Sequence, residues 1–250
     1  MSGRANVYDF TGNVALVTGA TGGLGPAVIE RFLTAGATVV GIGAKMDERR
    51  EQEMRAQVAT GADDANDRLT LLAANALDEA DVSRVVSDVV ARNGRLDILV
   101  NGIGGYYAGE PVAETPLEGW QRMLVLNLRP TFLFSKYAAR VMASQQSGRI
   151  INVSSRAAYS GRKNAAAYAT AKSGVITLTE AQAEELRDAR VTVNAIIPSI
   201  IDTPANRSAM PNADTSRWPP AEEVARVILF LASPDAELIS GAAIPVYGRA

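Results

Sequence analysis

Tyr168 and Lys172 stand four residues apart, and Ser155 lies thirteen residues before the tyrosine. Residues i and i+4 share one face of a helix, so this spacing places a phenol beside an ammonium group. A free tyrosine ionises near pH ~10, and a neighbouring cation lowers that pKa. A serine hydroxyl alongside would hold a substrate carbonyl. Together the three residues predict a proton-transfer site for a carbonyl or an alcohol.

The composition restricts the chemistry further. The chain of 250 residues contains no histidine and no cysteine. Their absence excludes Ser-His-Asp and Cys-His catalysis, disulfides and the usual zinc ligands, so we predict no metal site. A formal net charge of −2 gives no basic excess, and nucleic acid is therefore not an expected partner.

The hydropathy pattern gives no sign of a membrane partner. No apolar run approaches the ~20 residues that span a bilayer. Residues 1–10 carry no apolar core of the kind that a signal peptide has. We therefore expect a soluble, cytoplasmic protein.

Short β-branched runs alternate with longer helical stretches along the chain. Strands are expected at 14–18, 38–42, 69–73, 97–100, 149–153, 191–197 and 243–246, and helices at 25–35, 46–59, 79–92, 117–146, 165–187 and 221–231. Apolar strands that alternate with helices indicate a parallel sheet covered on both faces, in the doubly wound arrangement. No repeat or linker interrupts the pattern. We predict one α/β domain over residues 1–250, a Rossmann fold of about seven strands.

The first expected strand runs into a glycine-rich turn, Thr18-Gly19-Ala20-Thr21-Gly22-Gly23-Leu24-Gly25. Glycines permit a tight turn and let a pyrophosphate approach the start of a helix, where free N–H groups and the helix dipole favour anions. The spacing differs from G-x-G-x-x-G, so the turn alone does not identify a dinucleotide site. Its place after the first strand of a doubly wound pattern favours phosphate binding.

Taken in order, these residues resemble the short-chain dehydrogenase/reductase family. The matching stretches are Thr18-Gly-x-x-x-Gly-x-Gly25, Asn101-Gly102-Ile103-Gly104, Asn127, Ser155, Tyr168-x-x-x-Lys172 and 198–203. Each motif is weak alone, whereas the ordered set is specific and covers residues 14–247. The resemblance implies an NAD(P)(H)-dependent oxidoreductase that interconverts a carbonyl and an alcohol.

The resemblance also assigns roles to single residues. Tyr168 would be the general acid/base, Lys172 would lower its pKa and bind the nicotinamide ribose, Ser155 would hold the carbonyl, and Asn127 would hold a water of the proton relay. The implied cofactor-binding residues are Thr18, Gly19, Thr21, Gly23, Leu24, Gly25, Lys45, Asn75, Asn101, Gly102, Tyr168, Lys172, Pro198, Ile201 and Thr203.

A second Tyr-x-x-x-Lys, formed by Tyr159 and Lys163, contains Gly161 and reads as a loop. In the family the serine stands about a dozen residues before the catalytic tyrosine, which matches Ser155 with Tyr168. We therefore expect Tyr159 to line the substrate pocket.

The choice of nicotinamide cofactor depends on the residue that ends the second strand. An acidic side chain there binds the ribose 2′-OH and repels a 2′-phosphate. Gly43 occupies the position, and Lys45 nearby would pair with a 2′-phosphate, unless it is only a solvated loop charge. Asn75 replaces the family's aspartate after the third strand and is expected to reach the adenine. NADP(H) is therefore favoured, with NAD(H) as the alternative.

The proline-rich segment 199–220 lies between a strand and a helix and is typical of a substrate lid. Within it, residues 202–218 resemble the lid of dihydropteridine reductases, a branch of the same family that usually lacks a serine at the position of Ser155. Flat or apolar side chains near the expected site are the substrate candidates. They are Tyr106, Tyr159, Met210 and Trp218, although Trp218 also suits the role of anchoring the lid to the core.

Several interpretations stay open at this point. The substrate is a small-molecule carbonyl or alcohol, with a 3-oxoacyl-thioester reductase and a dihydropteridine-type reductase as more specific alternatives. A protein that senses NADPH without turnover belongs to another class, and the intact set of Ser155, Tyr168 and Lys172 argues against it. A purely structural domain would bind no dinucleotide. Members of the family are commonly tetramers, so we expect a homodimer or homotetramer.

Overall fold

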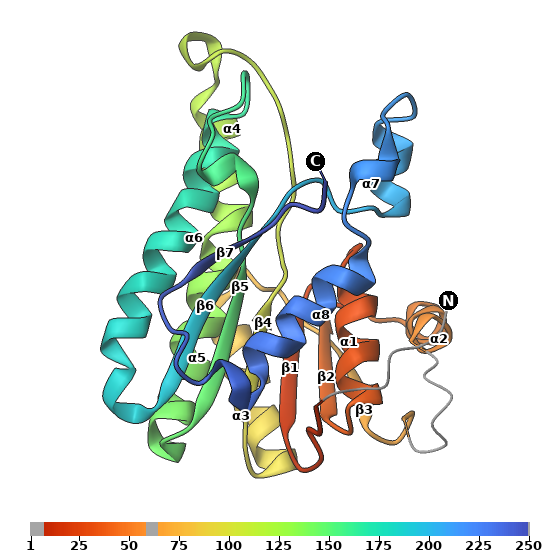
Figure 1. The fold of residues 1–250 in the computed structure, drawn as a ribbon, viewed down its shortest axis with the longest axis vertical. Coiled ribbons are helices and arrows are strands. Elements are labelled where there is room, and N and C mark those ends of the chain that lie inside the picture. The colour runs from red at the N-terminus through yellow and green to blue at the C-terminus, as the bar shows by residue number, and fades with distance from the viewer. Residues whose placement is uncertain (1–7, 59–64, 250) are drawn as a thin grey trace.

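The computed structural model describes residues 8–58 and 65–249 (Figure 1). They form a seven-stranded sheet in the order β3-β2-β1-β4-β5-β6-β7, and every pair of neighbouring strands is parallel. The strands are β1 Val14–Thr18, β2 Thr38–Gly43, β3 Leu69–Ala73, β4 Ile98–Asn101, β5 Gly148–Val153, β6 Val191–Pro198 and β7 Ala243–Val246. The predicted doubly wound α/β fold is confirmed.

Helices cover both faces of this sheet. They are α1 Gly25–Thr34, α2 Glu48–Gln57, α3 Glu79–Asn93, α4 Leu117–Asn127, α5 Arg129–Gln145, α6 Ala166–Glu185, α7 Pro204–Ala209 and α8 Ala221–Ala232. Successive residues of β1 point into different hydrophobic clusters. Ala15 and Val17 pack on the side of α1 and α8, whereas Val14 and Leu16 pack on the side of α3 and α5. A strand that is buried on both faces needs an unbroken apolar run, as the sequence of β1 has.

The topology predicts where a ligand binds. β1 pairs with β2 on one side and with β4 on the other, so the winding direction changes between β1 and β4. Ligands of open α/β sheets bind in the crevice at the carboxyl ends of such strands. In Figure 1 the helices α4 and α7, which follow β4 and β6, stand on either side of that end of the sheet.

Two elements differ from the sequence-based expectation. The helix expected over 117–146 is broken at Leu128 into α4 and α5. Pro130 lies in the first turn of α5, where a proline is tolerated because its missing N–H has no helical partner. The short helix α7 was not expected. Thr203 caps it by accepting a hydrogen bond from Asn206 N at 3.2 Å, and Pro204 again occupies the first turn.

Other boundaries agree to within a few residues. The helix expected over 46–59 is observed as α2, and residue 59 lies outside the described residues. Asp47 caps α2 by accepting a hydrogen bond from Arg50 N at 2.9 Å, and Gly94, with φ +75°, ends α3. Among the helices of residues 8–58 and 65–249, none has both the length and the apolar character that crossing a membrane requires.

Candidate active site

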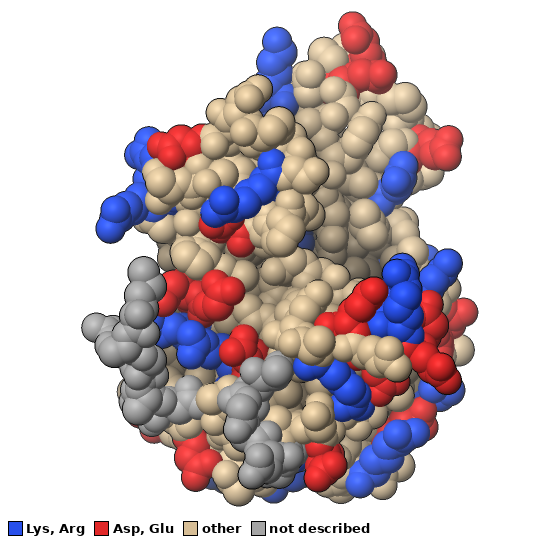
Figure 2. Space-filling view, turned by 90° about the vertical axis from the view of Figure 1, so that its right-hand side faces the viewer, with Lys and Arg blue, Asp and Glu red and all other residues tan. Residues whose placement is uncertain are grey.

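Ser155, Tyr168 and Lys172 meet at one cavity of about 340 Å³. Ser155 directly follows the loop after β5, and both Tyr168 and Lys172 lie on α6, so their i, i+4 spacing does place them on one helix. The cavity extends to Leu24, at the start of α1, and to Gly102, after β4. Seen in the space-filling view, the molecule is hollowed between its upper and lower parts (Figure 2). The site therefore lies in the crevice that the strand order predicts.

Burial controls the protonation of Tyr168. Burial raises the pKa of the Tyr168 phenol, and a hydrogen bond with the Ser155 hydroxyl opposes that rise more weakly. The ring of Tyr106 stands edge-on to that of Tyr168, with the centroids 5.0 Å apart, and its electrostatic effect raises the pKa of Tyr168 further. The net pKa of the phenol is raised, because desolvation of the phenolate is the largest effect. The predicted lowering of this pKa by Lys172 stays a prediction. At neutral pH the phenol keeps its proton, which is the form that donates to a carbonyl.

Lys172 is also buried, with 4 % of its surface exposed. Its ammonium donates a hydrogen bond to the carbonyl oxygen of Val153, at 2.9 Å, at the end of β5. Burial lowers the pKa of Lys172 to about 8, because the charged form loses its hydration. The ammonium is thus positioned by the end of a sheet strand and still carries most of its charge at pH 7.

Asn127 joins the site through the loop after β4. Its fully buried side chain exchanges two hydrogen bonds with the main chain of Gly105, each 3.0 Å long, and also donates to Met123 O at 3.1 Å. A Cβ atom at Gly104 would lie 2.7 Å from Asn127 Oδ1 and 3.0 Å from Lys172 Nζ. The side chains of Asn127 and Lys172 therefore both approach the Cα of Gly104, and the space there is too small for any residue larger than glycine. That Asn127 also binds a water of the proton relay stays a prediction.

The glycine turn packs against the chain segments that follow two other strands. A Cβ at Gly19, where φ is +75°, would lie 2.9 Å from the carbonyl carbon of Gly102. A Cβ at Gly23 would lie 2.7 Å from Thr203 Cγ2, and one at Gly25 only 2.3 Å from Ala20 O. None of the three glycines has room for a side chain, so the turn is tightly packed at the start of α1, where free N–H groups favour a pyrophosphate.

Replacing Gly19 with alanine tests this packing. We expect Gly19→Ala to lower the melting temperature and to weaken NADPH binding at least tenfold, about 1.4 kcal/mol, because the left-handed φ and the contact with Gly102 both oppose a side chain. Gly12→Ala is the matched control, since Gly12 has φ +81° and no atom within 4 Å of the added methyl group. It should lower stability alone. Equal NADPH affinity in the two variants would contradict the assignment of the turn to the cofactor.

Two residues are predicted to surround the adenosine end of the cofactor. Lys45 is exposed just beyond β2, and a Cβ at Gly43 would lie 3.3 Å from Thr21 Cγ2 in the glycine turn. Asn75 follows β3, and its Oδ1 accepts a hydrogen bond from Leu77 N at 3.1 Å. The contact of Lys45 with a 2′-phosphate and that of Asn75 with adenine stay predictions.

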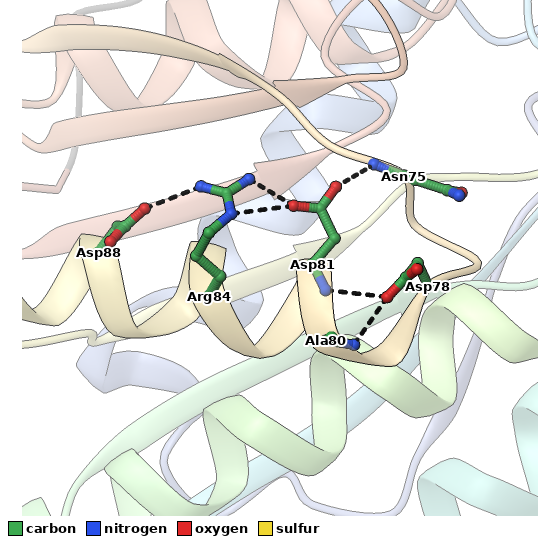
Figure 3. A network of polar contacts seen from close by, with 6 residues as sticks. All are labelled: Asn75, Asp78, Ala80, Asp81, Arg84 and Asp88. Atoms are coloured by element: carbon green, nitrogen blue, oxygen red, sulfur yellow. Dashed lines mark hydrogen bonds and ion pairs between the residues drawn. The ribbon is translucent and has the colours of Figure 1, made fainter.

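A network at the start of α3 fixes the backbone around Asn75 (Figure 3). Asp81 accepts a hydrogen bond from Asn75 N at 2.7 Å, and this bond together with Arg84 lowers the pKa of Asp81. Arg84 also pairs with Asp88 at 2.9 Å, and Asp78 caps the helix. In Figure 3 the side chain of Asn75 points away from Asp81, which leaves its amide nitrogen outside this network.

The remaining predicted residues divide between cavity and core. Those that line the cavity include Leu24, Gly102, Tyr106, Pro198, Ile201 and Met210. Asn101 is instead buried in the core, where its Nδ2 donates to Ser135 Oγ at 2.9 Å and to Asn152 Oδ1 at 2.8 Å. Tyr159 is 58 % exposed, Trp218 is 7 % exposed, and the lining includes neither residue. The burial of Trp218 agrees with the alternative role of anchoring the lid.

Sequence reasoning missed two arginines of the cavity wall, Arg156 and Arg162. Arg156 follows Ser155 directly, and that adjacency was the one signal in the sequence that pointed to it. Arg162 lies inside the second Tyr-x-x-x-Lys, between Tyr159 and Lys163. Its approach to the cavity depends on the path of the loop before α6, which no local pattern predicts.

Residues 13–214 match the family described as short chain dehydrogenase. The chain is 33% identical over 245 residues to 3-oxoacyl-(acyl-carrier-protein) reductase FabG of Thermotoga maritima, which covers 95% of this chain and 97% of that protein. It is 34% identical over 244 residues to a 3-oxoacyl-(acyl-carrier-protein) reductase of Synechocystis, with 95% and 96% covered. The chain therefore belongs to the short-chain dehydrogenase family.

Solved structures show the same fold. Levodione reductase superimposes with a TM-score of 0.85 at 29% identity and covers 96% of this chain and 97% of that chain. ElxO with NADP bound superimposes with a TM-score of 0.86 at 26% identity, with 94% and 97% covered. Family and fold together make the protein an NAD(P)-dependent oxidoreductase that acts on carbonyl or alcohol groups, with a nucleotide-binding Rossmann fold.

Proposed function

We propose that this chain reduces a ketone to an alcohol and prefers NADPH as the hydride donor. The observation that carries the proposal is that Ser155, Tyr168 and Lys172 line one cavity that reaches Leu24, beside the glycine turn. The nicotinamide supplies the hydride when bound. Tyr168 gives its proton to the carbonyl oxygen, and the Ser155 hydroxyl holds that oxygen. In this direction the Tyr168 phenol, whose pKa burial raises, acts as the proton donor.

The residues present suit a dinucleotide. The turn at Gly19, Gly23 and Gly25 excludes side chains from the start of α1, where the pyrophosphate would be held by free N–H groups. Lys172 lines the same cavity as Leu24, at the start of α1, and would bind the nicotinamide ribose. ElxO, which shares the fold at 26% identity, was solved with NADP bound.

The NADPH preference is tested at Gly43 and Lys45. We expect Lys45→Gln to lower kcat/KM for NADPH about tenfold, which corresponds to a charge-assisted contact of about 1.4 kcal/mol, and to leave NADH little changed. Gly43→Asp should reverse the preference, because the carboxylate repels a 2′-phosphate and binds a 2′-OH. The nearest atoms to the added Cβ, Met46 Cε at 3.1 Å and Thr21 Cγ2 at 3.3 Å, leave room after small shifts.

Initial rates with both cofactors measure these effects. Arg49→Gln is the matched control, because Arg49 is an exposed cation of α2 that pairs with Glu53 at 3.3 Å. If Arg49→Gln and Lys45→Gln lower kcat/KM for NADPH by similar factors, the effect is one of general surface charge. That result would count against a phosphate site at Lys45.

A second candidate function is the reduction of 3-oxoacyl thioesters. It is favoured by the relatives named 3-oxoacyl-(acyl-carrier-protein) reductase, which match the chain over nearly its whole length. A panel of ketones, diketones, quinonoid dihydropterin and neutral 3-oxoacyl thioesters distinguishes the substrate classes by their kcat/KM values. No turnover of any member, together with tight NADPH binding, would favour a sensor of NADPH.

We also propose a homodimer or homotetramer. An apolar groove runs between α4, α5 and α6, lined by Leu124, Val125, Leu128, Arg129, Phe132, Gly174 and Leu178. Phe132 is 45 % exposed at this groove, and burying such a ring against a second copy would be favourable. Light scattering of the wild type and of Phe132→Glu tests the assembly, which should dissociate in the variant. The cytoplasmic location stays a prediction.

A further inference from the structure

Positive charge predominates in the wall of the active-site cavity. Arg156 and Arg162 line it together with Lys172, and no carboxylate is found among the described residues that line it. Lys172 already donates to Val153 O and is buried. The two guanidinium groups are therefore the charges in the wall that have no assigned function.

Arg156 is held in position by the end of the chain. Its guanidinium lies over the ring of Tyr247, 5.0 Å from the ring centroid. The Ser199 hydroxyl donates to Tyr247 O at 2.8 Å, and Ser199 itself lines the cavity. The ring face restricts the orientation of the guanidinium without neutralising its charge. The ring of Tyr247 thus positions the Arg156 guanidinium in the cavity wall, next to Ser155 in the chain.

Neither cavity arginine has an ionic partner among the residues that the structure describes. On the nearby lid, Arg207 is paired with both oxygens of Asp202, at 2.6 and 2.7 Å. The ion pairs formed by the described residues include neither Arg156 nor Arg162. Arg156 is half-buried, and a partly desolvated cation without a counter-charge attracts an anion into its cavity.

From these contacts we propose that the ketone substrate carries a carboxylate and that Arg156 binds this carboxylate. Arg156 follows Ser155 in the chain and lines the same cavity, so one molecule reaches both residues. A guanidinium binds a carboxylate through two parallel hydrogen bonds and so also orients it. Arg162 is exposed to solvent in the same cavity wall, and its positive charge also attracts the carboxylate. This inference rests on the proposed function and narrows it to oxo acids.

The test compares matched ketones that differ in one charge. The pairs are acetoacetate with ethyl acetoacetate, and levulinate with methyl levulinate, each assayed with NADPH. In the wild type the acid should have the higher kcat/KM of its pair. Arg156→Gln should lower the acid-to-ester ratio of kcat/KM by about 10- to 100-fold, the range expected for a hydrogen-bonded charge pair. Arg156→Lys should have an acid-to-ester ratio between those of Arg156→Gln and the wild type. Lysine keeps the positive charge but cannot form the two parallel hydrogen bonds of a guanidinium.

Two further variants separate this role from general electrostatics. Lys163→Gln removes an exposed charge next to Arg162 that does not line the cavity, and it should leave the acid-to-ester ratio unchanged. Tyr247→Leu removes the ring beneath Arg156 and should lower the ratio by less than Arg156→Gln does. A ratio that falls equally in Lys163→Gln and Arg156→Gln would overturn the proposal.

The outcomes for substrate class and for function are distinguishable. Turnover of the esters with an acid-to-ester ratio that Arg156→Gln leaves unchanged overturns the carboxylate site, while the ketone reductase stands. If the wild type reduces neither member of either pair, the proposed function fails for these ketones. Calorimetric titration of the NADPH complex with acetoacetate and levulinate then decides the inference: binding that Arg156→Gln abolishes supports it, and no binding of either acid overturns it.

Discussion

Replacing Tyr168 with phenylalanine is expected to lower kcat for ketone reduction by roughly 10²- to 10⁴-fold, the usual contribution of a general acid. The variant keeps the ring that packs edge-on against Tyr106 at 5.0 Å, so the cavity keeps its shape. It loses the proton donor that the hydrogen bond with Ser155 orients. NADPH affinity, measured by fluorescence titration, should change little while the initial rate collapses.

Tyr159→Phe is the matched control for this experiment. Tyr159 begins the second Tyr-x-x-x-Lys, but its ring is 58 % exposed and does not line the cavity. The control should retain wild-type turnover. A Tyr168→Phe variant with nearly normal kcat would remove the basis for the proton-transfer role, whatever Tyr159→Phe does.

Replacing Lys172 with methionine is expected to reduce turnover and, separately, to change how stability depends on pH. Burial lowers the pKa of Lys172 to about 8 from its ordinary value of 10.5. Below pH 8 the lysine is protonated both in the folded and in the unfolded chain, and the folded state bears the cost of a buried cation. Between about pH 8 and 10.5 the folded chain releases the proton first, so the free energy of unfolding rises with pH.

Urea unfolding at pH 7 and pH 9.5 measures this effect. The wild type should gain on the order of 2 kcal/mol relative to Lys172→Met between these two pH values. Lys163→Met, at an exposed lysine of the loop before α6, should follow the wild-type curve. If the difference between wild type and Lys172→Met does not vary with pH, Lys172 is hydrated in the folded state, and the account of its burial is wrong.

The sheet and the covering helices were predictable because they follow from short-range patterns. The apolar run of β1 and its glycine turn indicated a buried parallel strand and a helix start, and both were found. The break at Leu128 was missed because apolar residues continue through it, and a proline in the first turn of a helix does not mark a boundary by itself. The short helix α7 was hidden in a proline-rich segment that reads as a loop.

The candidate site was predictable where spacing along one helix decides geometry. Tyr168 and Lys172 were expected on one face of a helix; both lie four residues apart on α6, and both line the cavity. The direction of the pKa shift of Tyr168 was not predictable, because it depends mainly on how deeply the folded chain buries the phenol, which no local pattern shows. The place of Arg156 over Tyr247 joins residues about ninety positions apart, and only the tertiary structure brings them together.

The most direct measurement follows a labelled hydride. The protein is incubated with NADPH that carries deuterium at both C4 positions and with a ketone that the panel identifies as a substrate, and the alcohol is analysed by mass spectrometry. We predict one deuterium on the carbinol carbon for the wild type, and less than roughly 1% of that rate for Tyr168→Phe. An alcohol without deuterium, or equal labelling rates in the two proteins, would contradict the assignment of a hydride-transferring reductase with Tyr168 as its proton donor.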